Sequence, residues 1–334
     1  MDSLSHLILK QPPPLDPEWL QHEEAANLRA PKQTYASPLD RQPIYAEERR
    51  RTTADMLAPS GPLHHLARIS KTHHLTVQST LDAFPIPILR FSDPRNETSD
   101  VAVVYFHGGG LCVGEADSEE LSCRWIVNGL PAAEVYSVGY RLMPGVPAAT
   151  CVRDAVDAFM YVRGLVPEAR VVVVGSSSGG QLAAAVSQFM PRGSLHGVVL
   201  RCPVTSDGGT SDEFVPEGLR GAYTTATPAF ETTLLPVFKR AVPRDGLKRL
   251  PLEVGVEEVR GMGMPRVWVQ VCSNDTLYGD GVCYAMLMRE AGVEVEVEVV
   301  EGWPHTFWVK APGLEGARRA EEGMVKGLKW VLGE

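Results

Sequence analysis

The chain has 334 residues and a net charge of −9, from 41 acidic and 32 basic side chains. An acidic chain with only short basic runs excludes a polyanion-binding surface, so we expect no nucleic-acid partner. It has no run of about 20 apolar residues that could span a membrane, no secretory pattern at its N-terminus, and six scattered cysteines without a CxxC motif, which together predict a cytoplasmic protein with free thiols.

The first 75 residues are expected to form a helical cap segment. They are rich in proline and charge, and residues 16–30 and 46–58 show short helical patterns without strong strands. We assign the main domain to residues 76–334.

Strand and helix patterns alternate through this main domain. Such alternation predicts an α/β fold with a mainly parallel sheet that is flanked by helices on both faces. We expect strands at 74–80, 84–93, 101–106, 133–142, 170–174, 197–204, 265–275 and 293–300, and helices at 150–165, 181–190 and 281–292.

The alternation stops between about 207 and 260, where the sequence is rich in turns and then weakly helical. A long insertion inside an α/β fold usually has a function, and ligands of such folds bind beyond the carboxyl ends of the strands. We therefore predict that this insertion and the N-terminal segment form a lid over that edge of the sheet.

Residues 175–180 read Gly-Ser-Ser-Ser-Gly-Gly, between a run of four valines and an alanine-rich helix. This fits the G-x-S-x-G pattern, in which a tight strand-to-helix turn presents the central serine and small neighbours are needed because the backbones crowd. On this pattern Ser177 is the nucleophile, beside the free N–H groups of the following helix. A flexible glycine–serine loop is the alternative, because the pattern alone is common by chance.

A second glycine-rich turn follows the strand at 101–106. Three glycines in succession let backbone N–H groups turn toward a substrate oxygen. We expect Gly108, Gly109 and Gly110, together with the N–H of Ser178, to form an oxyanion hole. His107, which precedes them, could act as a base, but we favour a structural role in supporting the glycine loop.

A nucleophilic serine needs a histidine base and an acid that orients it, and in a site of this kind they follow in the order Ser, Asp, His. Asp275 comes directly after a strand, and His305 follows a later strand. Parallel strands bring both side chains to the same edge as Ser177, so we predict a Ser177–His305–Asp275 triad. The competing acids are Asp280 and Glu301, whereas Asp207 lies too early in the chain.

The remaining histidines and the tryptophans have ordinary explanations. The pairs His64–His65 and His73–His74 lack an accompanying cysteine or carboxylate cluster, so we predict no metal site. Trp303 and Trp308 flank His305 and would ordinarily pack in a core. They could also line the substrate pocket, for which Leu111 is a third candidate.

In this order, the motifs resemble the hormone-sensitive-lipase-like branch of the α/β-hydrolases over roughly residues 75–330. The matching segments are HGGG at 107–110, YRLMPGVPAAT at 140–150, GSSSGG at 175–180, NDTLYGDG at 274–281 and AGVEVEVEVVEGWPHTFW at 291–308. Four residues depart from the family pattern: Ser176, Gly145 and Gly279 stand where acids are usual, and Thr306 stands where glycine is usual.

The resemblance implies an α/β-hydrolase fold and a serine esterase that cleaves a small or medium-sized carboxylic ester without a cofactor. A thioesterase, lactonase or acyl transferase acting on a biosynthetic intermediate would use the same triad. A non-catalytic small-molecule receptor shares the fold, but such receptors have lost the triad histidine, and His305 is present here. We expect no stable membrane insertion. Homodimers through an edge strand are common among relatives, and residues 293–300 could be such an edge, although their alternation equally fits a strand that is buried on one face.

Overall fold

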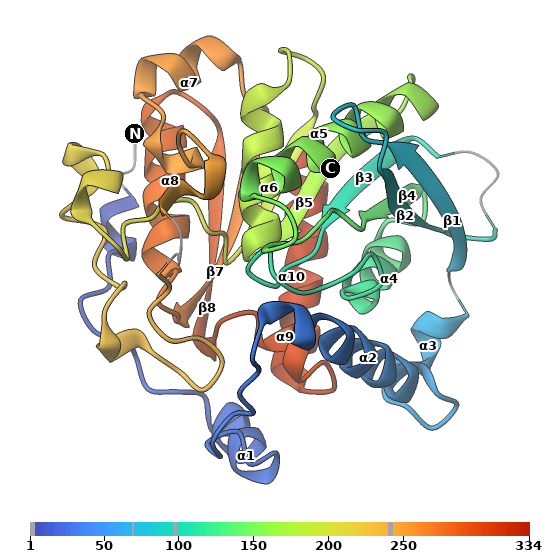
Figure 1. Ribbon diagram of the computed structural model, residues 1–334, viewed down its shortest axis with the longest axis horizontal. Helices are drawn as coiled ribbons and strands as arrows, with labels where there is room; N and C mark the ends of the chain where they lie inside the picture. The colour runs from blue at the N-terminus through green and yellow to red at the C-terminus, as the bar shows by residue number, and fades with distance from the viewer. Residues whose placement is uncertain (1–3, 69, 96–98, 240–242) are drawn as a thin grey trace.

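An eight-stranded sheet runs through the centre of the computed structural model, which describes residues 4–68, 70–95, 99–239 and 243–334 (Figure 1). The strands are β1 (Lys71–Gln78), β2 (Pro85–Ser92), β3 (Val101–Phe106), β4 (Ala133–Val138), β5 (Arg170–Ser176), β6 (Gly197–Arg201), β7 (Val267–Asn274) and β8 (Val295–Pro304). Their order in the sheet is β1-β2-β4-β3-β5-β6-β7-β8. Only the pairs β1–β2 and β2–β4 are antiparallel, so the predicted mainly parallel sheet is confirmed.

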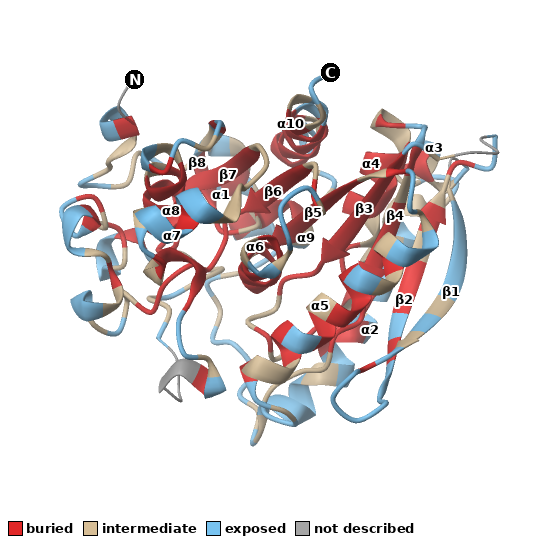
Figure 2. Ribbon diagram, turned by 90° about the horizontal axis from the view of Figure 1, so that it is seen from above, coloured by how far each residue is buried: buried red, intermediate tan, exposed pale blue. Residues whose placement is uncertain are grey.

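Helices cover both faces of this sheet, and its central strands are buried between them (Figure 2). One face packs against α5 (Ala148–Leu165), α6 (Ser178–Phe189) and α8 (Tyr278–Glu290), and the other against α3 (His64–Ala67), α4 (Glu120–Gly129) and α10 (Glu315–Leu332). Val171 and Val173 face the first core, whereas Val172 and Val174 face the second. A strand that is buried on both faces is therefore continuously apolar rather than alternating.

The helices α4 and α10 are absent from the elements predicted above. In α10 the pattern is weakened by Gly316, Gly323 and Gly327, because glycine is a poor helix former. These glycines are required by close packing: a Cβ at Gly327 would lie 2.3 Å from the ring of Trp268 on β7, and one at Gly316 would lie 2.1 Å from the ring of Trp303.

The N-terminal segment lies against the loops that follow the carboxyl ends of the strands. It contains η1 (Leu4–Leu7), α1 (Pro17–Ala25) and α2 (Pro38–Leu57). The Asn274 side chain at the end of β7 donates to the carbonyl of Pro13 (2.7 Å), and the Gln42 amide donates to the carbonyl of Cys112 in the loop after β3 (2.9 Å). The sheet itself begins at Lys71, so the boundary predicted at residue 75 falls inside β1.

The insertion at 207–260 consists of turns and short 3-10 helices, and it is tied to the chain after β7. Its elements are η2 (Asp212–Phe214), η3 (Glu217–Leu219), η4 (Pro228–Phe230), η5 (Pro243–Gly246), η6 (Pro251–Glu253) and the start of α7 (Val256–Met262), with residues 240–242 outside the described residues. The Tyr223 hydroxyl donates to Asp280 (2.7 Å), and the Thr276 hydroxyl donates to the carbonyl of Pro236 (3.2 Å).

None of the helices in the described parts of the chain is both long and apolar enough to cross a membrane.

Candidate active site

Ser177 sits on a strained turn between β5 and α6. Its backbone has φ 54° and ψ −120°, a conformation that costs free energy in a residue with a side chain. The glycines around it are required by space: a Cβ at Gly175 would lie 2.1 Å from the carbonyl oxygen of Gly179, and a Cβ at Gly179 would lie 2.0 Å from that of Phe106. The turn therefore has the form that the G-x-S-x-G pattern predicts, and it leaves Ser177 half-buried.

The structure brings Ser177, His305 and Asp275 together in one hydrogen-bond chain. His305 Nε2 lies 2.9 Å from Ser177 Oγ, and His305 Nδ1 lies 2.6 Å from Asp275 Oδ2. His305 and Asp275 are both buried, at the carboxyl ends of β8 and β7. This is the arrangement of a nucleophile, a base and an orienting acid.

The competing acids are placed differently. The Asp280 carboxylate accepts the N–H groups of Thr205 (2.8 Å) and Ser206 (3.0 Å) and the Tyr223 hydroxyl, so it anchors the start of the insertion. Glu301 is exposed on β8. Asp275 is the acid that the structure pairs with the histidine.

The environment of His305 suits a base that becomes charged. Burial favours the neutral ring, but the charge and the hydrogen bond of Asp275, together with smaller contributions from Cys202, raise the pKa of His305 above its ordinary value. Asp275 thus stabilises the imidazolium that forms when His305 takes a proton.

A thiol that is not among the predicted site residues lies beside this hydrogen-bond chain. Cys202 follows β6 with φ 44°, and its sulfur, a ring nitrogen of His305 and a carboxylate oxygen of Asp275 lie within 4.8 Å of one another. Burial raises the pKa of Cys202, but hydrogen bonds with Cys272 and His305 lower it to about 7. Cys202, Asp275 and His305 are the one cluster of three potential metal ligands in the described part of the chain. Because both ring nitrogens of His305 are already hydrogen-bonded, we assign this cluster to the triad and not to a metal site.

The glycine loop lies against the nucleophile turn, but its glycines differ. Gly109 (φ 126°) and Gly110 (φ 66°) have left-handed backbones, which glycine adopts at little cost. The N–H of Gly108 instead donates to the Glu119 carboxylate (2.7 Å). Its predicted place in the oxyanion hole is therefore corrected: this N–H is already used inside the protein.

Ser178 links the turn to the loop. It is the first residue of α6, where backbone N–H groups have no acceptor within the helix. Its hydroxyl accepts the N–H of Leu111 (3.1 Å). This bond holds the glycine loop over the helix N-terminus, and the geometry leaves Gly109, Gly110 and Ser178 as the candidate oxyanion donors.

His107 is fully buried and bonds within its own loop. Its Nδ1 lies 2.7 Å from the carbonyl of Gly108, and its ring stacks on Tyr140 with the centroids 4.3 Å apart. The Tyr140 hydroxyl donates to the His107 carbonyl (2.7 Å). These contacts give His107 the surroundings of a loop support rather than of a base.

The three candidate pocket residues are all buried. Trp303 and Trp308 are each 2% exposed and belong to a small core with Trp19 and Phe307. Trp303 stacks on Phe307 with the centroids 4.1 Å apart, and the buried Arg201 guanidinium lies 3.9 Å above the ring of Trp308. We therefore correct their assignment from pocket wall to core packing. Leu111 packs in the main core, and its pocket role stays a prediction.

A serine on a strained strand–helix turn, a buried acid–histidine pair and an adjacent glycine loop define the class of site found in serine hydrolases. Comparisons with known proteins agree with this class. The pattern of a family described as alpha/beta hydrolase fold matches residues 103–309.

Two curated relatives match most of the chain. Ethyl acetate hydrolase of Pseudomonas putida is 30% identical over 266 residues, which are 74% of this chain and 78% of that protein. Versiconal hemiacetal acetate esterase of Aspergillus parasiticus is 28% identical over 255 residues, which are 73% of this chain and 79% of that protein. The solved structure of EstE1, a carboxylesterase cloned from a metagenomic library, superposes with a TM-score of 0.70 at 25% identity and covers 89% of this chain and 98% of its own.

Other relatives are longer than this chain. It spans 32% of the FAD-linked oxidoreductase pytB of Aspergillus terreus, at 29% identity over 277 residues, and 56% of Lipase 2 of Moraxella sp.. The similarity to those two proteins therefore concerns only a part of each. The family pattern covers more than half of this chain, and the chain belongs to the α/β-hydrolase family, in its hormone-sensitive-lipase-like branch.

Proposed function

We propose that this chain is a serine carboxylic ester hydrolase that acts on a small or medium-sized ester through an acyl-enzyme. The observation that carries the proposal is the unbroken hydrogen-bond chain from Asp275 Oδ2 through His305 to Ser177 Oγ, with steps of 2.6 and 2.9 Å. The relatives named as ethyl acetate hydrolase and versiconal hemiacetal acetate esterase support a carboxylic ester as the substrate.

The proposed reaction has two halves. Ser177 Oγ attacks the ester carbonyl carbon while His305 Nε2 takes the hydroxyl proton, and the tetrahedral adduct then expels the alcohol, which receives that proton. Water attacks the acyl-enzyme, again giving a proton to His305. The adduct releases the carboxylic acid and returns the proton to Ser177.

The developing negative charge needs donors that are already in place. The N–H groups of Gly109, Gly110 and Ser178 are the proposed oxyanion hole, because the loop and the helix N-terminus bring them to the nucleophile turn. Loss of one such donor typically lowers kcat by about 10²–10³-fold.

The N-terminal segment and the insertion are proposed to cover the substrate. Both are bonded to residues next to Asp275: the carbonyl of Pro13 accepts from Asn274 at the end of β7, and the carbonyl of Pro236 accepts from Thr276. A covered and half-buried Ser177 favours short acyl chains over long ones.

A fluorophosphonate probe and a series of p-nitrophenyl esters of increasing acyl length test the proposal. We expect the probe to label Ser177, as mapped by peptide mass spectrometry, and hydrolysis to be fastest for the short esters. Ser177→Ala is the matched control and should neither label nor turn over. Label on another residue, or hydrolysis that survives in Ser177→Ala, would contradict the assignment.

Lactones, thioesters and an added alcohol acceptor belong in the same assay. A thioesterase, a lactonase or an acyl transferase would use the same three residues, and the products distinguish them from an ester hydrolase. A receptor would bind its ligand without releasing a burst of p-nitrophenol. The hydrogen bond between His305 and Ser177 argues against such a non-catalytic function.

We also propose a cytoplasmic location and a homodimer through β8. The five buried cysteines are free thiols, which suits a reducing compartment: Cys123, Cys151, Cys202, Cys272 and Cys283. The strand β8 lies at an edge of the sheet. Fractionation of cells and sedimentation velocity of the purified chain are the respective measurements.

A further inference from the structure

The carboxylate of Glu119 lies beneath the nucleophile turn and joins it to the glycine loop. Glu119 is 6% exposed. Its oxygens accept the Ser176 hydroxyl (2.6 Å), the N–H of Gly108 (2.7 Å) and the Tyr105 hydroxyl (2.6 Å). One side chain thereby connects the residue before the nucleophile with the first glycine of the loop.

Glu119 occupies the N-cap position of α4. The side chains that usually accept N–H groups of the first helical turn from this position are the shorter ones of Ser, Thr, Asp and Asn. The Glu119 side chain makes no such capping bond. Its carboxylate is directed away from its own helix and toward the loop.

The loop has little freedom at the point that Glu119 holds. A Cβ at Gly108 would lie 3.2 Å from the Glu119 carboxylate, 3.2 Å from the carbonyl of Ser176 and 3.3 Å from Ser177 Cβ. The hydrogen bond to Gly108 therefore fixes the backbone just before Gly109 and Gly110, whose N–H groups are the proposed oxyanion donors.

Three hydrogen bonds and a nearby cation hold the Glu119 carboxylate. All three groups that bond to it are donors, and hydrogen bonds to a charged acceptor are stronger than neutral ones. The buried guanidinium of Arg201 also interacts electrostatically with Glu119. Burying a polar group is costly unless it is hydrogen-bonded, and these bonds meet that need.

We propose that Glu119 is the positioning residue of the oxyanion loop, and that it supplies from the start of α4 the acidic group that the family often carries at the position of Ser176. This inference rests on the proposed ester hydrolysis. Glu119 does not touch the substrate and acts through Gly108. Ser176, which stands where the family often has an acid, is the hydrogen-bond partner of Glu119.

Glu119→Ala and Glu119→Gln test the proposal. We expect kcat for p-nitrophenyl acetate to fall between about tenfold and about 100-fold in Glu119→Ala, somewhat less than when a donor is lost outright. KM should change by less than about threefold, because ground-state binding does not depend on the oxyanion donors. Affinity for a trifluoromethyl ketone, which forms an oxyanion on Ser177, should fall in parallel with kcat. Glu119→Gln keeps one acceptor oxygen and should restore part of both.

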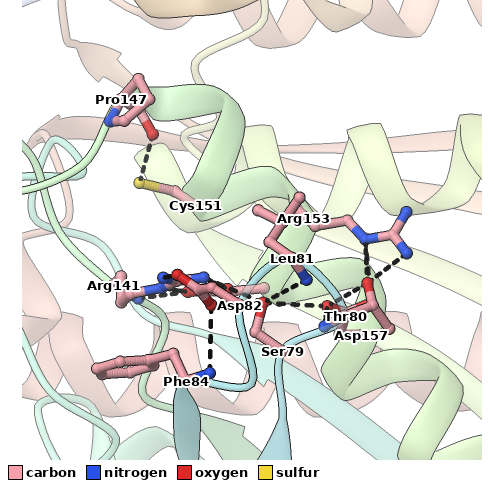
Figure 3. Close-up of polar contacts among 11 residues, drawn as sticks. Ser79, Thr80, Leu81, Asp82, Phe84, Arg141, Pro147, Cys151, Arg153 and Asp157 are labelled. Atoms are coloured by element: carbon pink, nitrogen blue, oxygen red, sulfur yellow. Dashed lines mark hydrogen bonds and ion pairs between the residues drawn. The ribbon is translucent and has the colours of Figure 1, made fainter.

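Asp157 provides the matched control, since it is also 6% exposed and also anchors a turn. It accepts the backbone N–H of Thr80 (2.7 Å) and pairs with Arg153 (3.1 Å), in the cluster where α5 meets the turn between β1 and β2 (Figure 3). Asp157→Asn should lower thermal stability and leave kcat and the ketone affinity unchanged.

An exchange of the acid gives a second, independent test. Ser176→Asp alone places a carboxylate against Glu119 and should reduce kcat. Adding Glu119→Gln removes the repulsion and should recover activity relative to Ser176→Asp. This pair decides the question even where Glu119→Ala fails to fold.

Hydrogen exchange of the peptide that contains Gly108 to Gly110 tests the positioning role of Glu119 independently of ester hydrolysis. Exchange should be faster in Glu119→Gln whether or not the chain hydrolyses esters. The proposal is overturned if Glu119→Ala loses stability as Asp157→Asn does while kcat, ketone affinity and loop exchange stay at wild-type values. Absence of ester hydrolysis in the wild type would instead overturn the proposed function.

Discussion

Two neighbouring serines of the nucleophile turn lead into two separate hydrogen-bond systems, each of which contains a buried carboxylate. Ser177 bonds to His305 and through it to Asp275, from the carboxyl ends of β8 and β7. Ser176 bonds to Glu119, which holds Gly108 at the end of β3. The Asp275 carboxylate faces a base that changes charge during the reaction. The Glu119 carboxylate accepts hydrogen bonds from two hydroxyls and a backbone N–H, whose charge does not change. Proton transfer and loop geometry are therefore assigned to opposite sides of one turn.

The largest expected contrast is between the two serines themselves. Ser177→Ala should lower kcat by about 10⁶-fold, because the acyl-enzyme is an ester of Ser177 and cannot form without its hydroxyl. Ser176→Ala removes one of the three donors to Glu119 and should cost less than about tenfold in kcat. Hydrolysis of p-nitrophenyl acetate by folded variants, checked by circular dichroism, measures both. Similar losses in the two variants would break the division of roles.

The next contrast is between two buried acids that lie five positions apart on the chain. Asp275→Asn should lower kcat by about 10⁴-fold, the typical result when an amide replaces the acid that orients the base. Asp280→Asn keeps an acceptor for Thr205 and Ser206 and should leave kcat within about tenfold of wild type. The same ester assay applies, and an equal loss in Asp280→Asn would mean that the insertion it anchors takes part in catalysis.

The Ser177 side of this comparison could be predicted from the sequence. Four valines before a glycine–serine turn identify a strand that is buried on both faces, and the later strands deliver Asp275 and His305 to the same edge. Thr306 departs from the usual glycine, yet its φ of 44° shows that the chain still makes the left-handed turn that glycine would favour. Backbone topology was sufficient for these residues.

The Ser176 side depends on side-chain direction, which the sequence does not reveal. Glu119 stands among several acids before a helix, and nothing in that run distinguishes a capping acid from one that turns toward a loop. The three glycines after His107 look equivalent, although only Gly108 gives its N–H to Glu119. Trp303 and Trp308 flank the base along the chain, but their rings pack into a core with Phe307.

Substitutions at Gly109 and Gly110 test how strictly catalysis depends on the backbone geometry of the glycine loop. A Cβ at Gly109 would lie 2.0 Å from the carbonyl oxygen of Val113, whereas one at Gly110 would meet no atom within 4 Å. Gly109→Ala should therefore displace the donors and lower kcat by about 10²–10³-fold. Gly110→Ala faces only the strain of a left-handed backbone, about 1–2 kcal/mol, and should lose less activity. Trifluoromethyl ketone affinity measured beside kcat checks both, and equal effects would mean that the loop is less constrained than its contacts indicate.

The smallest effect is a shift in pH dependence, and it distinguishes the two carboxylates most directly. His305 can accept the Ser177 proton only when its ring is neutral, so kcat/KM falls as pH drops below the pKa of His305 in the free enzyme. Burial lowers that pKa, but Asp275 and, to a smaller extent, Cys202 raise it above 6.5, so the half-maximal rate should lie above pH 6.5. Asp275→Asn removes the largest of the raising contributions while burial remains, so the residual activity should reach half its maximum at a lower pH.

The same shift has a consequence for stability. A histidine whose folded-state pKa is raised contributes stability that is fully present below its unfolded value of 6.5 and is lost as pH rises through the folded value. The melting temperature of wild type should therefore exceed that of Asp275→Asn most between about pH 5 and 6.5, where carboxylates are ionised and the histidine is charged, and the difference should shrink as pH rises further. Ser176→Ala and Glu119→Gln should leave the half-maximal pH unchanged, because Glu119 bonds to Ser176, Gly108 and Tyr105 rather than to the base. If Glu119→Gln moved it as far as Asp275→Asn does, the two carboxylates would belong to one titrating system, and the separation between proton transfer and loop geometry would be wrong.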